Sequence, residues 1–271
     1  MAEQAAQLAH QRRAFILDAI QRDGTVRVAD LVGQLGVSDM TIRRDLDALA
    51  RRGAVEKVYG GAVATAGAGA SGHEPGFDAK SDLEGAAKAA IAATAATLVE
   101  PGSVVALSGG TTAHAVAARL LGVPGLTIVT NSLPVADLVR AAGRDGGTPA
   151  PTLLLTGGTP TPSAALVGPV ADLVIGSLHV DLLILGAHGV AEGAGLTTPN
   201  LTEAQTNRAL VASARRVAVV ADHSKWGVVG LSGFAGLDQA DWFVTDAGMP
   251  APARAVLREA VGELLIAGEE H

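Results

Sequence analysis

The chain contains no cysteine among its 271 residues. This excludes disulfide bonds, zinc sites built on thiolates and cysteine nucleophiles, and it fits a reducing compartment such as the cytoplasm. Aromatic residues make up only 3% of the sequence, although 48% of the residues are hydrophobic. A large core must therefore be built from Ala, Val, Leu and Ile, which suits helices packed on a parallel sheet.

Long apolar runs are also missing from the sequence. No stretch of about 18 residues is continuously apolar, and the first residues lack the apolar centre of a signal peptide. We therefore expect a soluble cytoplasmic protein that has no membrane partner.

The formal net charge of −7 opposes binding to nucleic acid, but it is unevenly distributed. Residues 1–61 contain nine Lys or Arg and eight Asp or Glu, so they carry +1, which leaves −8 on the rest. A case for DNA must therefore rest on the local arrangement of side chains. We expect an N-terminal domain over 1–61, a Gly-rich linker over 62–76 and a second domain over 77–271.

The first domain has the pattern of a winged helix-turn-helix. Apolar spacing predicts helices over 11–22 and 28–35, with Gly36 ending the second. Ser38 offers an N-cap to a third helix, in which the apolar residues Ile42, Leu46 and Leu49 share one face. Two short helices joined by a Gly-containing turn are typical of helix-turn-helix proteins, whose second helix enters the major groove. Residues 54–62 alternate apolar and polar side chains and contain a Gly pair, as a two-stranded wing would.

The third helix places arginines where they could reach DNA. Arg44 and Arg51 lie opposite its apolar face, Arg43 flanks it, and Lys57 follows in the wing. A guanidinium offers a planar donor fork to guanine edges or phosphates. The alternative is that Arg43 and Arg44 form surface ion pairs with acidic neighbours, namely Asp39, Asp45 and Asp47.

The second domain alternates strands with helices, which predicts an α/β fold with a mostly parallel sheet covered on both faces. Strands are expected over 103–107, 126–130, 152–156, 181–186, 217–221 and 241–245. Helices are expected over 82–99, 112–121, 133–142, 202–214 and 251–266.

Five polar or Gly-rich loops follow predicted strands, at the sheet edge where open α/β proteins bind ligands. In the first of them, 108–114, main-chain N–H groups and two threonine hydroxyls meet at a helix N-terminus, which favours an anion. Lys225 could supply a charge to a phosphate, and Asp222 could hold its ammonium group or a sugar hydroxyl. Ordinary glycine turns and a solvated loop lysine are the alternatives.

Residues 37–62, VSDMTIRRDLDALARRGAVEKVYGGA, closely resemble the DeoR family of bacterial sugar-metabolism repressors. The resemblance continues through GTT at 110–112, TNS at 130–132, DHSKWG at 222–227 and VTD at 244–246. It implies that the TIRRDL helix reads DNA and that the second domain, related to ribose-5-phosphate isomerase and CoA transferases, binds a phosphorylated sugar. The DNA-contacting candidates are Ser38, Thr41, Arg43, Arg44, Arg51 and Lys57.

The chain departs from the family pattern in three respects, of which one is the low aromatic content, which removes a stacking platform for a sugar ring. Ser108-Gly109 stands where an Asp is common, and Asn207 stands where a Lys is usual. Lys80 and Lys88 fall near basic positions of the family and are further ligand candidates. The effector-binding candidates are Ser108, Gly109, Gly110, Thr111, Thr112, Asn131, Ser132, Gly157, Gly158, Gly186, Gly189, Glu203, Asp222 and Lys225.

Together with the helix-turn-helix pattern, the resemblance implies a repressor of carbohydrate-catabolism genes that binds double-stranded operator DNA under control of a phosphorylated sugar. Half-sites on DNA mirror the symmetry of the protein, so we expect at least a homodimer. No cofactor is expected, and the histidines lack the spacing of a metal site. The alternative is a sugar-phosphate isomerase with a DNA-binding module, in which Glu203, Asp222 and Lys225 would perform acid-base chemistry.

Overall fold

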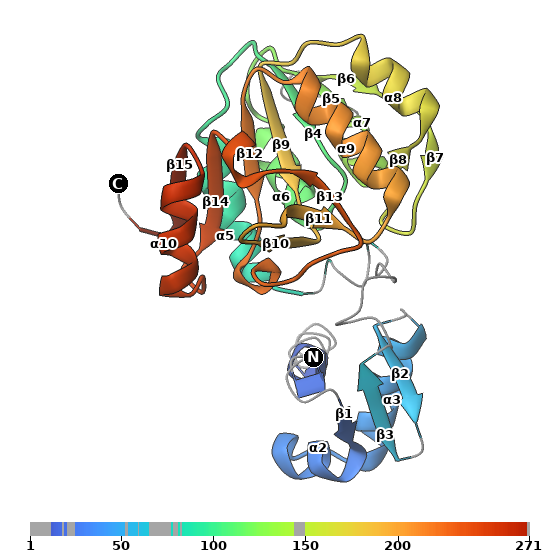
Figure 1. The fold of residues 1–271 in the computed structure, drawn as a ribbon. Helices are drawn as coiled ribbons and strands as arrows, with labels where there is room; N and C mark the ends of the chain where they lie inside the picture. The colour runs from blue at the N-terminus through green and yellow to red at the C-terminus, as the bar shows by residue number, and fades with distance from the viewer. Residues whose placement is uncertain are drawn as a thin grey trace. The chain divides into compact units, whose positions relative to one another are not determined.

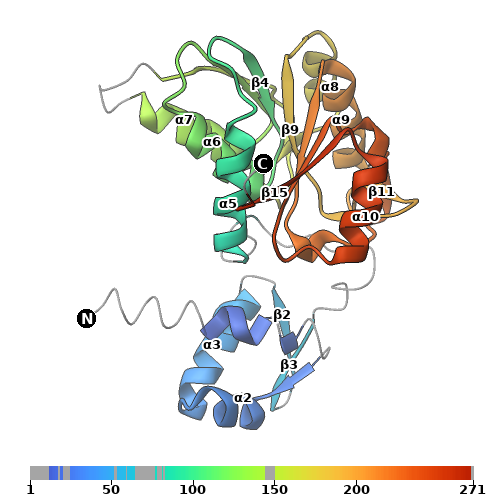
Figure 2. The same cartoon turned by 90° about the vertical axis from the view of Figure 1, so that its left-hand side faces the viewer.

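The computed structural model describes residues 12–17, 19–20, 25–51, 54–58, 60–64, 77, 81, 83–143 and 150–269. The chain divides into two compact units, Met1–Leu83 and Glu84–His271 (Figures 1 and 2). Most of the expected linker, together with Lys80, lies outside the described residues. No helix among those described is long and apolar enough to span a membrane.

The first unit is a winged helix. Residues 12–17 and 19–20 are helical, and they are followed by β1 (Thr25–Arg27), α2 (Val28–Leu35), α3 (Asp39–Arg51), β2 (Val55–Val58) and β3 (Gly61–Ala64). The strands form one antiparallel sheet in the order β1-β3-β2. The expected helix-turn-helix and wing are confirmed, and β1 adds a strand that the sequence pattern did not predict.

The wing continues beyond the boundary expected at residue 61. Ala64 pairs with Val55 of β2, and Val63 pairs with Thr25 of β1. The last three residues of β3 therefore belong to the sheet and not to a linker, because β1 supplies hydrogen-bond partners that lie far away in the sequence.

The core of this unit joins the three helices to the sheet. Its largest fully buried side chains are Ile16, Ile20, Leu31, Ile42 and Leu46. Leu49 is also buried, so the apolar face predicted for the third helix is confirmed.

The second unit is built on a seven-stranded parallel sheet (Figure 1), ordered β15-β14-β12-β9-β4-β5-β6. Its strands are β4 (Val104–Leu107), β5 (Thr127–Thr130), β6 (Thr152–Leu155), β9 (Leu182–Gly186), β12 (Val217–Val220), β14 (Trp242–Asp246) and β15 (Glu263–Ala267). Smaller antiparallel sheets contain β7 (Thr159–Pro160) with β8 (Leu166–Val167), and β10 (Gly189–Ala191), β11 (Gly195–Thr198) and β13 (Ser232–Ala235).

Helices cover both faces of the large sheet. One core packs the sheet against α5 (Gly85–Ala96), α6 (Thr111–Leu120) and α7 (Leu133–Ala142). The other packs it against α8 (Pro169–Gly176), α9 (Leu201–Ser213) and α10 (Ala251–Ala260), together with the β10-β11-β13 sheet. Burial on both faces explains why the central strands are apolar at nearly every position, and the expected α/β architecture is confirmed.

The helix expected over 251–266 is wrong beyond Ala260. The chain turns at Val261 and Gly262, and residues 263–267 form β15 beside β14. A Cβ on Gly262 would lie 2.5 Å from the carbonyl oxygen of Asp241, so this close passage requires glycine. The apolar run after Gly262 therefore fills a parallel edge strand, whose partner is distant in sequence.

Candidate functional site

The turn between α2 and α3 is fixed by local chemistry. Gly36 ends α2 in the left-handed conformation, with φ 63°, and its N–H donates to the Val32 carbonyl. Ser38 Oγ accepts a hydrogen bond from the Thr41 N–H at 3.3 Å and lies 2.9 Å from Thr41 Oγ1. The predicted cap is present, and it holds both hydroxyls at the start of the recognition helix.

The basic side chains of α3 differ in how they are engaged. Arg43 is tied to Asp39 one turn earlier, with Nε 2.5 Å from Oδ1, as the ion-pair alternative supposed. Arg44 forms no ion pair with any residue that the structure describes, and it is exposed. Arg51 lies two turns further along the same exposed stripe. Arg44 and Arg51 therefore both lie on the exposed face of α3.

Lys57 of the wing is paired with Asp47 of α3. Both side chains are exposed, and the hydrogen bond from Lys57 is the main cause that lowers the pKa of the Asp47 carboxyl below 3.8. This contact joins the wing to the recognition helix at the surface.

Asp45 has a different role from its acidic neighbours in the TIRRDL motif. Its side chain is only 3% exposed, and its two carboxylate oxygens accept hydrogen bonds from Nε of Arg12 and Nε of Arg13, at 2.5 and 2.9 Å. It therefore ties the first helix to α3 and is not a surface partner of Arg43 or Arg44. The sequence pattern does not reveal these contacts, because the partners are over 30 residues apart.

The loops after β4, β5 and β9 form one hydrogen-bonded group at the carboxyl edge of the sheet. Ser108 Oγ accepts from the Gly186 N–H at 3.0 Å, and Asn131 Oδ1 accepts from the Gly109 N–H at 3.0 Å. Asn131 Nδ2 donates to the Leu166 carbonyl. The structure thus brings these predicted residues together. The side chains of Ser108 and Asn131, however, already form hydrogen bonds to main-chain groups of the protein.

Several other candidate residues have structural roles, as a helix cap or as glycines where two backbone segments pass closely. Ser132 caps α7, accepting from the Val135 N–H at 3.4 Å. A Cβ on Gly158 would lie 2.7 Å from the Val167 carbonyl oxygen, and a Cβ on Gly189 would lie 2.2 Å from that of Val228. These two glycines allow close passage of neighbouring backbone, which is a structural requirement for their residue type. Gly157, also in the left-handed region, lies beside Val170.

The start of α6 presents an open N-terminus. Gly110 precedes the helix with φ 120°, no side chain caps it, and nothing lies within 4 Å of where its Cβ would stand. Thr111 is half-buried and Thr112 is buried in the first turn. Unsatisfied N–H groups of a first helical turn attract anions. One turn later, burial lowers the pKa of His114 below 6.5, which favours its neutral form.

Glu203 is buried in the first turn of α9. Its carboxylate accepts hydrogen bonds from Ser163 Oγ and Thr198 Oγ1, both at 3.1 Å. The Asn200 side chain caps the same helix through the N–H groups of Thr202 and Glu203. The carboxylate is therefore held by neighbouring hydroxyls at the helix start.

Asp222 follows β12 and is completely buried. Its Oδ1 accepts hydrogen bonds from Ser224, including one from the main-chain N–H at 3.0 Å, whereas its Oδ2 has no donor among the described residues. A buried carboxylate oxygen without a donor is costly, and it points to a missing partner such as a ligand or water. Lys225 lies three residues further on and is half-buried.

A pair that the sequence pattern does not predict, His223 and Asp246, lies beside Asp222. Asp246 accepts from the His223 N–H at 2.8 Å and from the Gly248 N–H at 3.0 Å, and its Oδ2 is 2.8 Å from His223 Nδ1. Burial raises the pKa of Asp246, but these hydrogen bonds outweigh it and lower the pKa below 3.8. The signal available was the carboxylate in VTD at the end of β14, next to β12 in the sheet.

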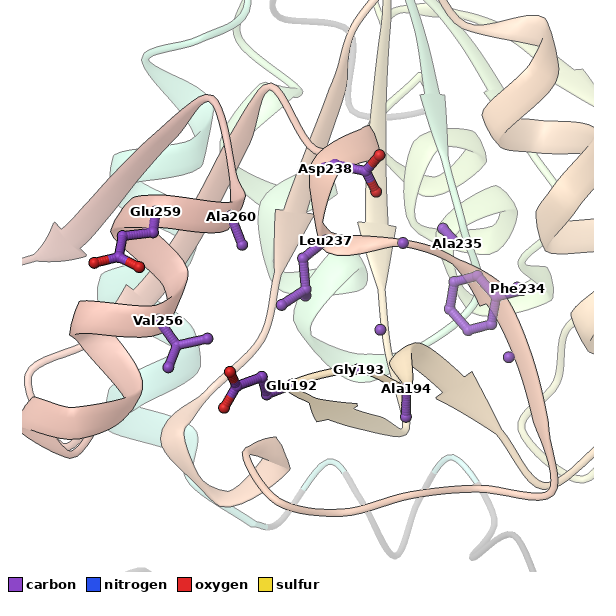
Figure 3. A pocket seen from close by; sticks show the side chains of 13 residues that line it. Glu192, Gly193, Ala194, Phe234, Ala235, Leu237, Asp238, Val256, Glu259 and Ala260 are labelled. Carbon is purple, nitrogen blue, oxygen red and sulfur yellow. The ribbon is translucent and has the colours of Figure 1, made fainter.

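Two hollows in the second unit lie away from these loops. One, of about 750 Å³, lies between the β10-β11 hairpin and α10, and Figure 3 shows the carboxylates of Glu192, Asp238 and Glu259 around it. The other, of about 280 Å³, lies where several strands begin and contains Arg215, Arg216 and Trp242. The three acids of the first hollow disfavour an anionic ligand. Across the described ranges, no cluster of three or more His, Asp or Glu side chains could hold a metal ion.

Comparison with known proteins matches both units. The DeoR-like helix-turn-helix domain matches residues 12–66, and the DeoR C terminal sensor domain matches residues 84–247. The chain is 33% identical to the putative aga operon transcriptional repressor of Escherichia coli O157:H7, over 96% of this chain and 94% of that protein. It is 31% identical to the glycerol-3-phosphate regulon repressor of Escherichia coli K12, over 92% and 95%.

Among solved structures, the chain is similar to ribose 5-phosphate isomerase A from Methanocaldococcus jannaschii. The identity is 19% and the TM-score 0.37, over 51% of this chain and 53% of the other. The full-length relatives, by contrast, are named as transcriptional regulators and repressors. With a winged helix that presents exposed arginines and with matches over nearly its whole length, the chain belongs to the DeoR family and is a DNA-binding transcriptional regulator, not an enzyme.

Proposed function

We propose that the chain represses carbohydrate-catabolism genes and that a phosphorylated sugar, bound at the carboxyl edge of the large sheet, changes its affinity for operator DNA. Two relatives are named as repressors of the aga operon and of the glycerol-3-phosphate regulon, which supports this class of target. Arg44 and Arg51 would contact DNA from the recognition helix, with the hydroxyls of Ser38 and Thr41 at its start.

One observation carries the effector proposal: the open N-terminus of α6 and the unpartnered Oδ2 of Asp222 lie on the same sheet edge. The strand β9 separates β4 from β12, so the two loops are roughly 10 Å apart at ordinary strand spacing. A phosphate at Gly110 to Thr112 and a sugar hydroxyl on Asp222 would fit this span. Lys225 would add positive charge on the Asp222 side.

The proposal requires two conformations or assemblies with different affinity for the sugar. A tenfold loss of operator affinity corresponds to about 1.4 kcal/mol of coupling between the two sites. Two winged-helix units in one oligomer make such coupling effective, because a change in the distance between them removes both from their half-sites on the operator. The homo-oligomer is therefore part of the proposal.

The test is operator binding by fluorescence anisotropy, using the native upstream DNA with pentose and hexose phosphates. We expect one phosphorylated sugar to change the affinity and its unphosphorylated form to have no effect. Thr111→Val should weaken the response about tenfold, whereas Thr97→Val, an exposed site at the end of α5, should not. An equal response to phosphorylated and unphosphorylated sugars would contradict the phosphate site.

A further inference from the structure

The most exposed large apolar side chain described in the winged unit lies on its recognition helix, α3. Met40 is 60% exposed, whereas Phe15 of the first helix and Val58 of β2 are 41% and 42% exposed. Among the described residues, the apolar core of this unit takes up Val37, three positions earlier, but not Met40. A single exposed apolar residue is ordinary, so the position of Met40 decides what it contributes.

Met40 lies on the side of α3 that faces directly away from the core. At 100° per residue, it is roughly 160–180° around the helix from Ile42 and Leu49, and both of those side chains are buried. Arg44 follows one turn later on the same side as Met40 and is also exposed. The exposed side of α3 therefore begins with an apolar residue and continues with an arginine.

The polar side chains around Met40 are engaged with one another. Ser38 Oγ lies 2.9 Å from Thr41 Oγ1. Asp39 accepts hydrogen bonds from Arg43 Nε and Nη2, at 2.5 and 3.2 Å. The thioether of Met40 has no hydrogen to donate and is only a weak acceptor. The first turn of α3 therefore presents to DNA an apolar side chain beside two polar pairs that are already formed.

The place of Met40 on the helix determines which part of DNA it would meet. The second helix of a helix-turn-helix contacts base edges in the major groove with its N-terminal residues, and Met40 is the second residue of α3. The apolar group that bases expose in this groove is the C5 methyl of thymine. A methionine side chain is unbranched and flexible, so it adapts readily to the position of such a group.

We propose that Met40 determines part of the operator specificity by contacting the C5 methyl group of a thymine in the major groove. The contact removes apolar surface of both groups from water, and cytosine at the same place lacks the methyl group. Arg44 lies about 6 Å further along the helix axis, which corresponds to roughly two base-pair steps. We therefore expect the thymine close to the base or phosphate that Arg44 reaches. The inference concerns the winged unit alone and requires no sugar.

The test uses a DNA duplex that the full-length chain selects from a pool of random sequences, so the regulated genes need not be known. Each thymine of the duplex is replaced in turn by uracil, which removes the C5 methyl group and keeps the base pair. Fluorescence anisotropy should show a loss of affinity of roughly fourfold for at least one thymine, as expected when one methyl group is no longer buried. A selection without any preferred sequence, or a duplex in which no thymine responds, would overturn the proposal.

Met40→Ala determines whether Met40 is the side chain that meets the methyl group. At the responsive thymine, this variant should bind the thymine and uracil duplexes almost equally, because its shorter side chain no longer reaches the methyl group. Phe15→Ala is the matched control, since it truncates an exposed apolar side chain of the first helix and should keep the parent's loss. If Met40→Ala keeps that loss at every responsive thymine, another side chain reads the methyl group and the proposal is wrong. Absence of a sugar response would contradict the proposed function alone.

Discussion

Asp45 Oδ2 accepts a hydrogen bond from Arg12 Nε at 2.5 Å, and this contact joins the first helix of the winged unit to its recognition helix. Arg13 occupies the other carboxylate oxygen. The acidic residue of the TIRRDL motif therefore positions α3 from its buried side, while its neighbour Arg44 is exposed.

Asp45→Asn should destabilise the winged unit by about 2 kcal/mol, since it leaves two partly buried guanidinium groups without their counter-charge. Hydrogen exchange of amides in α3 measures the free energy of opening of this unit. Asp47→Asn is the matched control, because it removes an exposed pair with Lys57 from the same helix and should barely alter the exchange. Equal effects of the two substitutions would contradict the structural role of Asp45.

Two glycines of the winged unit should respond to alanine with opposite signs. A Cβ on Gly61 would lie 2.0 Å from the Val26 carbonyl oxygen, so Gly61→Ala must separate β3 from β1 and should cost 2 kcal/mol or more, by about the scale of overpacking. Gly33 lies inside α2 with open space around it, so Gly33→Ala should stabilise the unit by about 0.5–1 kcal/mol. Urea unfolding followed by circular dichroism would measure both, and a stabilising Gly61→Ala would contradict the close approach.

The sequence predicted elements whose signals are local. The helix α7 was predicted at its observed bounds, because its apolar spacing begins after a Ser cap and Pro follows one residue later. The strand β15 was assigned to a helix because its apolar run follows a helical pattern, and only pairing with β14 makes it a strand. The helix α8 was not predicted, since eight residues that are apolar all round show no period.

The candidate site also combines features that local sequence predicts with features that depend on long-range contacts. Loops at the carboxyl edge could be predicted, because parallel strands bring their ends together. The uses of individual side chains could not, since Ser108 meets Gly186 and Asp246 meets His223 only in the folded sheet. Long-range hydrogen bonds leave no period or spacing in a single sequence.

Arg44→Ala should weaken operator binding by about 1–3 kcal/mol if its guanidinium contacts a base. Binding to DNA of unrelated sequence should be weakened less, because no specific base contact is lost there. Titrations at several salt concentrations would distinguish a base contact from a phosphate contact. If Arg44 contacts a phosphate, its loss should also lower the slope of log affinity against log salt concentration by about one. Arg140→Ala, an exposed arginine in α7, is the control. Unchanged affinity of Arg44→Ala would remove Arg44 from the interface.

Asp246 should make the second unit sensitive to acid. Its pKa is lowered below 3.8 in the folded chain, so its stabilising contribution is complete above the unfolded value and is lost as pH falls through the folded value. The free energy of unfolding should therefore decrease from about pH 4 downward. Asp246→Asn should flatten this decrease, whereas the exposed Asp238→Asn should leave it unchanged. A variant at Asp246 with the parent's acid dependence would contradict the assignment.

Asp222→Asn should reduce the affinity for the phosphorylated sugar about tenfold, a loss of roughly 1.4 kcal/mol. The two oxygens of the buried carboxylate differ: Oδ1 accepts from the Ser224 N–H, whereas Oδ2 is buried without a donor among the described residues and would accept from a sugar hydroxyl in the proposed complex. An asparagine side chain has one acceptor oxygen and one NH2 donor group. Its NH2 group must therefore face either the Ser224 N–H or the sugar hydroxyl, and one of the two acceptor contacts is lost. Ser224→Ala removes only the hydroxyl contact to Oδ1, and isothermal titration calorimetry should show its sugar affinity unchanged. If Asp222→Asn binds the sugar phosphate as the parent does, Oδ2 is satisfied by water and the ligand lies elsewhere on this edge.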